Sequence, residues 1–195
     1  MGFLLILTPY IIEHAGYSGE ILVAHESLNK PFDKAIVYID RHDIGGATGV
    51  VVNKPLSESD HSKLAPFLRD SGIPVSYGGP LEFPEKIVVL IELDPVTPGG
   101  RPIFELGFWD DAVREMPDLL TRIQQSLKRG EQRYRVFAGY TSWGPFQLES
   151  ETLVNGSWYA IRSNHDLLFQ TGPAVKWEIL EPAEKAKGEP KGNQS

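Results

Sequence analysis

The chain has 195 residues, of which 41% are hydrophobic and 23% are charged, and these values are typical of a soluble globular protein with one domain. It has no cysteine, which excludes disulfide bonds, zinc sites built on cysteine, and thiol nucleophiles. The formal net charge is −7, and an acidic protein repels the phosphates of DNA unless its basic residues gather on one face.

The N-terminal stretch carries an apolar run over residues 2–7, which Thr8 and Pro9 interrupt. This run is too short for a transmembrane helix, so we expect no membrane span. No Lys or Arg precedes it, as one would in an export signal. We therefore expect residues 1–19 to be an N-terminal extension, packed as an arm on a cytoplasmic protein. The alternative is a degenerate export signal, which would place the protein in the periplasm.

Residues 20–181 are expected to form one compact domain. Short runs of β-branched and aromatic residues predict its strands. These runs cover residues 20–24, 34–40, 47–53, 75–80, 86–92, 133–140 and 157–161. Strands come first along the chain and then alternate with helices, which predicts an α/β or α+β fold with a mixed β-sheet flanked by helices. Residues 41–46 are predicted to form a loop.

Helices are predicted where apolar residues recur at helical spacing, and in two short segments near the C-terminus. They cover residues 60–70, 112–129, 166–169 and 175–180. Gly130 ends the longest of them, and the pair Met116 and Pro117 is placed to kink its first turn. Residues 182–195 lack large apolar side chains, so we expect a disordered tail.

Residues 137–151 form the stretch around which the rest of the chain is arranged, and they read as a strand, a tight turn and a helix start. Gly139 interrupts the end of the strand, and Gly144 allows the chain to turn. Pro145 suits a first helical position, where no N–H is needed. Gln147 stands three residues after Gly144, which is the spacing of one half of a capping box.

Lys128, Arg129, Arg133 and Arg135 form a basic cluster, which Glu131 interrupts. Such a cluster on one face would be the footprint of a nucleic-acid site. Its position at the end of the predicted long helix and the start of a strand favours a solvated helix end and strand edge instead.

Several motifs occur together in residues 40–43, 45–55, 77–80 and 137–158. In this combination, which extends from about residue 20 to about residue 177, the chain resembles the YqgE/AlgH family of bacterial proteins. The resemblance implies a compact α/β domain with a mixed sheet, and one branch of the family is named for regulation of the transcription of exopolysaccharide genes. No catalytic residues are agreed for the family. The family positions found here are Asn53, Pro55, Gly78, Gly79, Pro80, Gly139, Tyr140, Trp143, Gln147, Glu149 and Trp158.

Several predicted strands end in turns that carry polar or aromatic residues. If these strands are neighbours and run in the same direction, their turns meet at one edge of the sheet, where open α/β sheets bind ligands. The candidate ligand-binding residues are Asn53, Lys54, Tyr77, Gly78, Gly79, Tyr140, Ser142, Trp143, Gln147 and Glu149. The alternative is structural, with Trp143 and Trp158 as core anchors and the polar groups bonded to the backbone of the turns.

Ser142 has the strand–turn–helix setting of a nucleophile elbow, but the pattern G-x-S-x-G is incomplete, because Tyr140 stands where the first glycine is needed. His42 and His165 could serve as bases, although nothing in the sequence places them near Ser142. The histidines also lack the spacing of metal ligands. We therefore expect no catalytic residue, no metal and no cofactor.

Together these features predict a non-catalytic regulatory or binding protein that acts through a protein partner or a small ligand. Direct reading of DNA is disfavoured by the net charge and by the lack of a recognisable helix-turn-helix motif. The alternative is a small-molecule-binding protein or an enzyme, such as a hydrolase, that uses the cleft at the strand ends.

Overall fold

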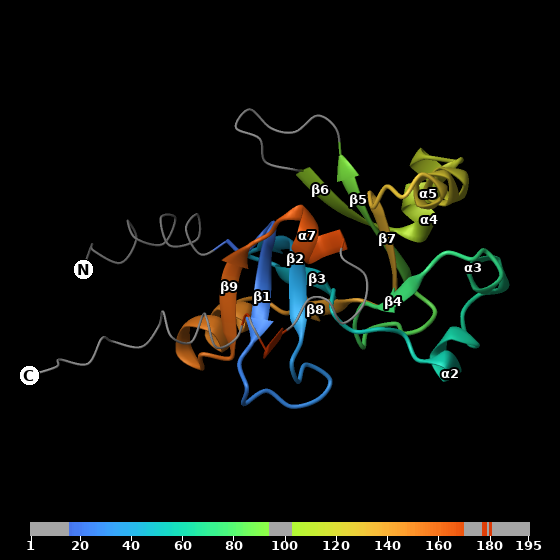
Figure 1. Cartoon of the computed structure of the whole chain (residues 1–195). Helices are drawn as coiled ribbons and strands as arrows, with labels where there is room; N and C mark the ends of the chain where they lie inside the picture. Colours follow the sequence, from blue (N-terminus) through green and yellow to red (C-terminus); the bar gives the residue numbers. More distant parts are fainter. Residues whose placement is uncertain (1–15, 94–102, 170–176, 179, 181–195) are drawn as a thin grey trace, which may run out of the picture.

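The structure, a computed structural model, describes residues 16–93, 103–169, 177–178 and 180. Its strands form two sheets that face each other across a shared core, with helices on the outer sides (Figure 1). The predicted fold class, α/β with helices flanking β-structure, is confirmed. The single mixed sheet of the prediction is replaced by two sheets, of which only the second is mixed.

The first sheet has five strands in the order β8-β3-β2-β1-β9, and every neighbouring pair is antiparallel. Its strands are β1 (Glu20–Ala24), β2 (Ile36–Asp43), β3 (Gly46–Val51), β8 (Thr141–Trp143) and β9 (Trp158–Arg162). Strand β1 is fully buried after its first residue, as expected for a continuous apolar run between two layers.

The second sheet has four strands in the order β4-β7-β5-β6. Its strands are β4 (Val75–Tyr77), β5 (Ile87–Leu93), β6 (Ile103–Phe108) and β7 (Tyr134–Ala138). The pair β4–β7 is parallel, and the other two pairs are antiparallel. Strand β6 therefore lies at one edge of this sheet and β4 at the other.

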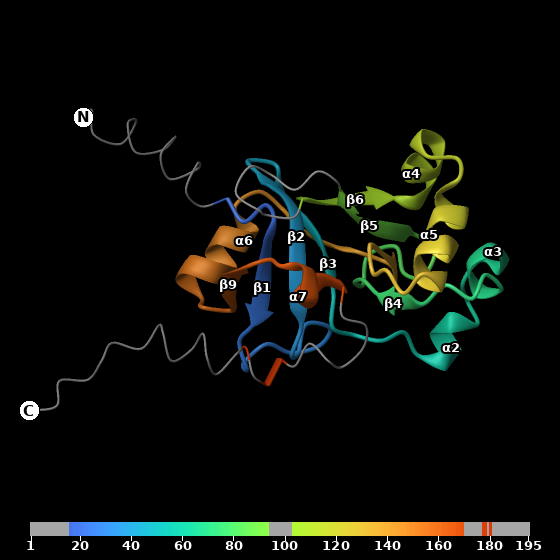
Figure 2. The same ribbon diagram turned by 45° about the horizontal axis from the view of Figure 1, so that its top comes forward.

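Helices pack on the outer faces of both sheets (Figure 2). Helices α4 (Trp109–Glu115) and α5 (Leu119–Lys128) pack on the second sheet. On the first sheet, α6 (Gln147–Glu149) is followed by a π-helical turn, η1 (Ser150–Val154). Helix α7 (His165–Phe169) contributes to the core between the two sheets. The remaining helices, α2 (Glu58–His61) and α3 (Pro66–Arg69), lie on the connection from β3 to β4.

Proline divides both of the longer predicted helices. The helix predicted over residues 112–129 is two helices, α4 and α5, separated at Met116 and Pro117, because proline cannot donate the N–H that would continue the first helix. The helix predicted over residues 60–70 is likewise two single turns, and Pro66 opens the second of them.

Two strands were not predicted. Strand β6 has exposed and half-buried residues and contains Gly107, so it lacks the run of buried residues by which β5 is recognised. Strand β8 has only three residues and follows β7 after Gly139 and Tyr140. The predicted loop over residues 41–46 is also mostly strand, because β2 extends to Asp43 and β3 begins at Gly46.

Several predictions concern residues outside the described part of the chain. These are most of the N-terminal extension (residues 1–15), the segment over residues 94–101, whose prolines and glycines predict a loop, half of the helix predicted over 175–180, and the tail from residue 182. Across the residues that are described, no helix combines the length and the apolar character needed to cross a bilayer.

Candidate functional site

The two sheets are joined by closely packed glycine turns. The N–H of Gly78, directly after β4, donates to the carbonyl of Ala138 at 2.8 Å, and the carbonyl of Gly78 accepts from the N–H of Val51 at 2.7 Å. A Cβ atom on Gly79 or on Gly139 would overlap the facing backbone, and Gly139 has a φ of +73°. Glycine is required here because two backbone segments cross without room for side chains. The chain passes from the second sheet to the first at this crossing.

A cavity of about 440 Å³ lies beside this crossing. It is bounded by the face of the first sheet that carries Thr48 and Ser142 and by strands β5 and β6 of the second sheet. This volume is within the range of small-molecule sites. Its lining comes from β2, β3, β5, β6 and β8 and from the turn between β7 and β8. It consists of Asp40, Arg41, Thr48, Val88, Leu106, Gly107, Phe108, Tyr140 and Ser142.

Polar side chains from three neighbouring strands form one wall of the cavity. Thr48 of β3 is paired with Ser142 of β8 on one side and with Arg41 of β2 on the other. Side chains at directly paired positions lie next to each other on one face of a sheet, so the hydroxyls of Thr48 and Ser142 are neighbours. The Ser142 hydroxyl donates to the carbonyl of Ala47 at 2.9 Å, which leaves its oxygen able to accept a hydrogen bond from a ligand.

Asp40 connects the polar wall to the second sheet. The register between β2 and β3 shifts between Ile39 and Arg41, so Asp40 is the extra residue of a β-bulge. Bulges redirect side chains and are common beside functional sites. One carboxylate oxygen of Asp40 accepts from the backbone N–H of Leu106 at 3.1 Å, and the bulge thereby fixes the edge strand β6 against the first sheet.

The opposite wall of the cavity is aromatic. The rings of Phe108 and Tyr140 meet edge to face, with their centroids 5.4 Å apart, a favourable arrangement for aromatic pairs. The ammonium of Lys86 lies 4.6 Å from the centroid of the Phe108 ring, and the hydroxyl of Tyr140 donates to Glu82 at 2.8 Å. These contacts hold both rings in place before any ligand enters.

Burial raises the pKa of the Asp40 carboxyl above its ordinary value. A carboxyl whose pKa is higher in the folded than in the unfolded protein contributes most to stability at low pH, and this contribution is lost as the pH rises through the folded pKa. We therefore expect Asp40→Asn, which keeps an amide oxygen for the N–H of Leu106, to raise the melting temperature at about pH 7 and to change it little at about pH 3. Thermal melts of both proteins across this range test it, and a variant less stable at neutral pH would contradict it.

The other predicted ligand-binding residues lie apart from this cavity. The amide of Asn53 accepts from the N–H of Ile36 and donates to the carbonyl of Lys34, both at 2.8 Å, so it closes the loop before β2. The ammonium of Lys54 donates to the carbonyl of Pro31 at 2.7 Å. Asn53 and Lys54 line a different, smaller cavity of about 170 Å³.

Trp143 points to the helix side of the first sheet, where it is only 3% exposed. One oxygen of Glu151 accepts from the indole N–H of Trp143 at 3.0 Å and from that of Trp158 at 2.9 Å. The other oxygen accepts from the amide of Gln147, whose own oxygen accepts from the N–H of Gly144 at 3.0 Å. The predicted half of a capping box between Gly144 and Gln147 is thus present. Both tryptophans act as core anchors.

Glu149 and Tyr77 belong to two further contacts. Glu149 lies 3.1 Å from Nε2 of His42, without the geometry of a hydrogen bond. The ring of His42 is stacked on Tyr17 and accepts from its backbone N–H. Tyr77 packs edge to face against Phe83. The predicted residues therefore do not gather at one edge, because β3 and β8 are antiparallel and β4 belongs to the other sheet.

The two candidate bases, His42 and His165, have partners other than Ser142. His42 is next to Glu149, and Nδ1 of His165 lies 3.1 Å from Glu92. Neither histidine lines the cavity that contains Ser142. Within the described residues, no group of three or more His, Asp or Glu side chains is arranged to hold a metal ion.

Comparison with known proteins places the chain in a family. A family model described as AlgH-like matches residues 21–185. The chain belongs to the AlgH-like family. A UPF0301 protein of Streptomyces avermitilis is 33% identical over 178 residues, which cover 86% of this chain and 87% of the relative. A UPF0301 protein of Psychrobacter cryohalolentis is 32% identical over 176 residues, with 85% and 88% covered.

Two solved structures have the same fold. The solution structure of the AlgH protein from Pseudomonas aeruginosa matches with a TM-score of 0.57 and 21% identity, over 90% of each chain. An X-ray crystal structure of a protein from Corynebacterium diphtheriae matches with a TM-score of 0.58 and 20% identity, over 90% of this chain and 88% of the other. At these identities the likeness concerns the fold alone.

Sequence reasoning missed most of the lining of the larger cavity in this AlgH-like chain. Tyr140 and Ser142 were among the predicted residues, but Asp40, Thr48 and Phe108 were not. Thr48 carried a usable signal, since it is the one polar side chain of an otherwise apolar strand. Asp40 carried less, because it begins the polar half of β2, with Arg41, His42 and Asp43 after it. Phe108 carried none, because β6 itself was not recognised.

Proposed function

We propose that the protein is a non-catalytic, regulatory binding protein that takes a small polar molecule into the cavity between its two sheets. The observation that supports the proposal most is the composition of this cavity, in which the hydroxyls of Thr48 and Ser142 and the carboxyl of Asp40 face the rings of Phe108 and Tyr140. A mostly preformed cavity with a few convergent polar groups is typical of small-molecule sites.

The lining suggests the chemistry of the ligand. Thr48 and Ser142 offer hydroxyls that can donate or accept, and the exposed guanidinium of Arg41 lies at the cavity. The rings of Phe108 and Tyr140, which also line the cavity, offer an apolar contact. We therefore propose a ligand with several hydrogen-bonding groups on one side and a flat or apolar part on the other. The described lining contains no histidine that could activate Ser142, so the proposal is limited to binding.

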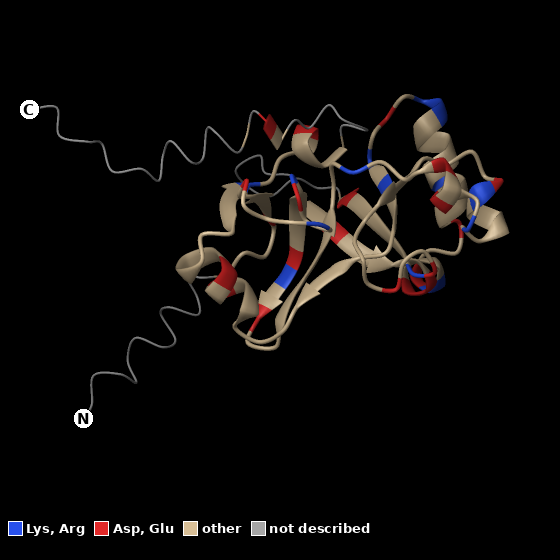
Figure 3. Ribbon diagram, turned by 90° about the horizontal axis from the view of Figure 1, so that it is seen from below, with Lys and Arg blue, Asp and Glu red and all other residues tan. Residues whose placement is uncertain are grey.

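Regulation through a ligand or a protein partner fits the charge of the molecule better than direct reading of DNA. Basic and acidic residues are interspersed over the ribbon (Figure 3). The basic cluster predicted at residues 128–135 does not form one solvated surface, because Arg135 is buried and Arg129 pairs with Glu131 at 3.0 Å. We propose the cytoplasm, rather than the periplasm, as the compartment of the protein.

The proposal is tested by screening the full chain against a library of small polar metabolites, with the melting temperature as the readout. A binding metabolite should raise it in a concentration-dependent way. Thr48→Ile keeps a β-branched residue in β3 but places extra carbon in the cavity. It should weaken the binding of any hit by about 5- to 150-fold, since an overpacked site costs on the order of 1–3 kcal/mol.

Thr121→Ile is the matched control, because Thr121 is exposed on α5 and does not line the cavity. It should bind each hit as the unchanged protein does. Hits whose affinity is the same in all three proteins would show that they bind elsewhere, and the proposed site would then be wrong.

A further inference from the structure

Arg135 is a buried cation. It lies on β7, which is flanked by β4 and β5 in the second sheet, and it is only 6% exposed. Among the described residues it is the only Asp, Glu, Lys or Arg that is classed as buried. Charged groups in such positions are normally paired with an opposite charge, because desolvation of an isolated ion is costly.

The partners of Arg135 among the described residues are neutral. One terminal nitrogen donates to the carbonyl of Leu168, in the last turn of α7, at 2.8 Å, and the other donates to the hydroxyl of Ser76 at 3.0 Å. The guanidinium carbon lies 4.8 Å from the centroid of the Phe137 ring. These contacts use two of the five N–H groups of the guanidinium. Within the part of the chain that the structure describes, no carboxylate pairs with its positive charge.

Burial lowers the pKa of Arg135 to about 10. The side chain therefore stays protonated at neutral pH and keeps its charge in the interior. The described lining of the two small cavities beside Arg135 contains no Asp or Glu that could neutralise it. An added anion would supply the missing opposite charge.

Two small cavities adjoin Arg135. The larger, of about 170 Å³, lies between the end of β3 and strand β4, and it is lined by Val52, Asn53, Lys54, Pro55, Leu56, Pro74, Val75, Ser76 and Arg135. The smaller, of about 140 Å³, lies between Arg135 and helix α5. Since a water molecule takes up about 30 Å³, the larger cavity has room for a group of only a few heavy atoms.

Arg135 and Ser76 together form a donor pair on this cavity. The Ser76 oxygen accepts from Arg135, so its own hydrogen is free to donate. A guanidinium beside a hydroxyl suits the oxygens of a carboxylate or a phosphate, and charge-assisted bonds of this kind are the strong ones. The polar ends of Asn53 and Lys54 are engaged by the loop before β2, where Asn53 donates to the carbonyl of Lys34 and Lys54 donates to the carbonyl of Pro31 and to Asp33.

We propose that the 170 Å³ cavity is a site for a small oxyanion, a carboxylate or a phosphate group, which is held by the guanidinium of Arg135 and the hydroxyl of Ser76. This site shares no lining residue with the cavity between the sheets, so a negative result at one site does not contradict binding at the other. Binding there would link β4, β7 and the end of α7, which Arg135 already connects.

The test is a titration of the full chain with potassium phosphate and, separately, with potassium acetate, at constant ionic strength maintained with potassium chloride. The readout is the ¹H–¹⁵N NMR signal of the arginine side chains together with the melting temperature. We expect a saturable shift of one arginine Nε–H signal for one of the two anions, and the anion that produces it identifies the class of ligand.

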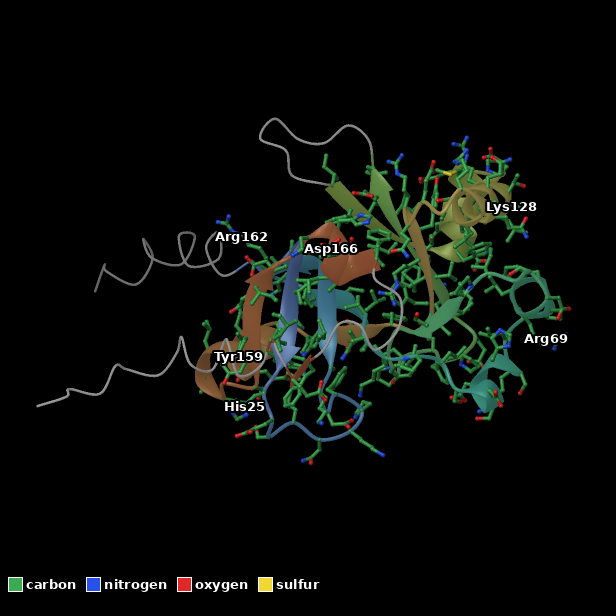
Figure 4. The ribbon with its side chains drawn as sticks, viewed as in Figure 1. His25, Arg69, Lys128, Tyr159, Arg162 and Asp166 are labelled. Carbon is green, nitrogen blue, oxygen red and sulfur yellow. The ribbon has the colours of Figure 1, made fainter. Side chains whose placement is uncertain are left out.

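Arg135→Met keeps a long apolar stem and removes the charge, so it should weaken this binding by about tenfold or more. Arg162→Met is the matched control, because Arg162 lies exposed on the outer strand β9 (Figure 4), and it should leave the titration unchanged. If Arg135→Met does not fold, Ser76→Ala decides, since loss of the hydroxyl should weaken binding by about two- to tenfold.

A saturable response in the unchanged protein and the Arg162 variant, which is lost or weakened in the Arg135 and Ser76 variants, supports the site. The absence of a saturable response to either anion would overturn it. So would a response that the Arg135 or Ser76 variant retains at full strength, because the anion would then bind elsewhere.

Discussion

Gly139→Ala is expected to destabilise the protein by about 3–5 kcal/mol, which is among the largest effects of single substitutions. Its φ of +73° costs a residue with a side chain about 1–3 kcal/mol. In addition, the new Cβ would overlap the carbonyl of Gly79, so the two backbone segments that join the sheets would have to separate. Urea denaturation measures the change as a lower midpoint at an unchanged slope.

Gly130→Ala separates these two causes. Gly130 has nearly the same φ, +71°, but a Cβ there would meet no atom within 4 Å. This variant should therefore lose only about 1–3 kcal/mol, the cost of the backbone conformation. If Gly139→Ala and Gly130→Ala were equally destabilising, the close crossing between the sheets would not be a critical feature of the fold.

Trp143→Ala is expected to cost about 3–5 kcal/mol, because it would empty a large volume in the core on the helix side of the first sheet. Trp143 is 3% exposed and packs against Phe32 and Trp158. It also donates its indole N–H to Glu151. Thermal and urea unfolding of the variant check the prediction, and an unchanged stability would contradict the role of Trp143 as a core anchor.

Trp143→Phe divides the loss between packing and hydrogen bonding. It keeps most of the ring and removes the N–H, which leaves Glu151 with its bonds from Trp158 and Gln147. The cost should be smaller, about 1–3 kcal/mol. A loss as large as that of Trp143→Ala would mean that the hydrogen bond to Glu151 dominates over the packing of the ring.

Local patterns predicted the parts of the fold that depend on local interactions. The strand over residues 20–24 was correct to the residue, because a continuous apolar run between two layers has few other solutions. The bond between Gly144 and Gln147 was predicted from spacing alone, since a capping contact spans a single turn. The break at Met116 and Pro117 likewise follows from the chemistry of proline.

Features that depend on long-range contacts could not be predicted. Strand β8 has three residues and exists because Thr141 pairs with Gly49, far away in the chain. Arg135 was interpreted as part of a solvated basic cluster, whereas β7 is an inner strand of its sheet and buries it. The larger cavity is formed by the bulge at Asp40 and its bond to Leu106, and no local pattern reports that contact.

The fold explains how Tyr140 and Ser142 reach the cavity. The chain leaves the second sheet at Ala138, turns at Gly139, and enters the first sheet at Thr141. Tyr140 therefore stands at the boundary between the sheets, and Ser142 follows on the edge strand β8. A substitution that opens the glycine crossing should consequently disturb the cavity as well as the stability of the protein.

The most direct test of the central claim, that the cavity between the sheets holds a small molecule, is native mass spectrometry of the full chain purified gently from its own host. We predict a reproducible extra mass, one per chain, that is present in the unchanged protein and in Thr121→Ile but is lost in Thr48→Ile. A protein that carries no extra mass, or an extra mass that Thr48→Ile retains in full, would contradict the claim.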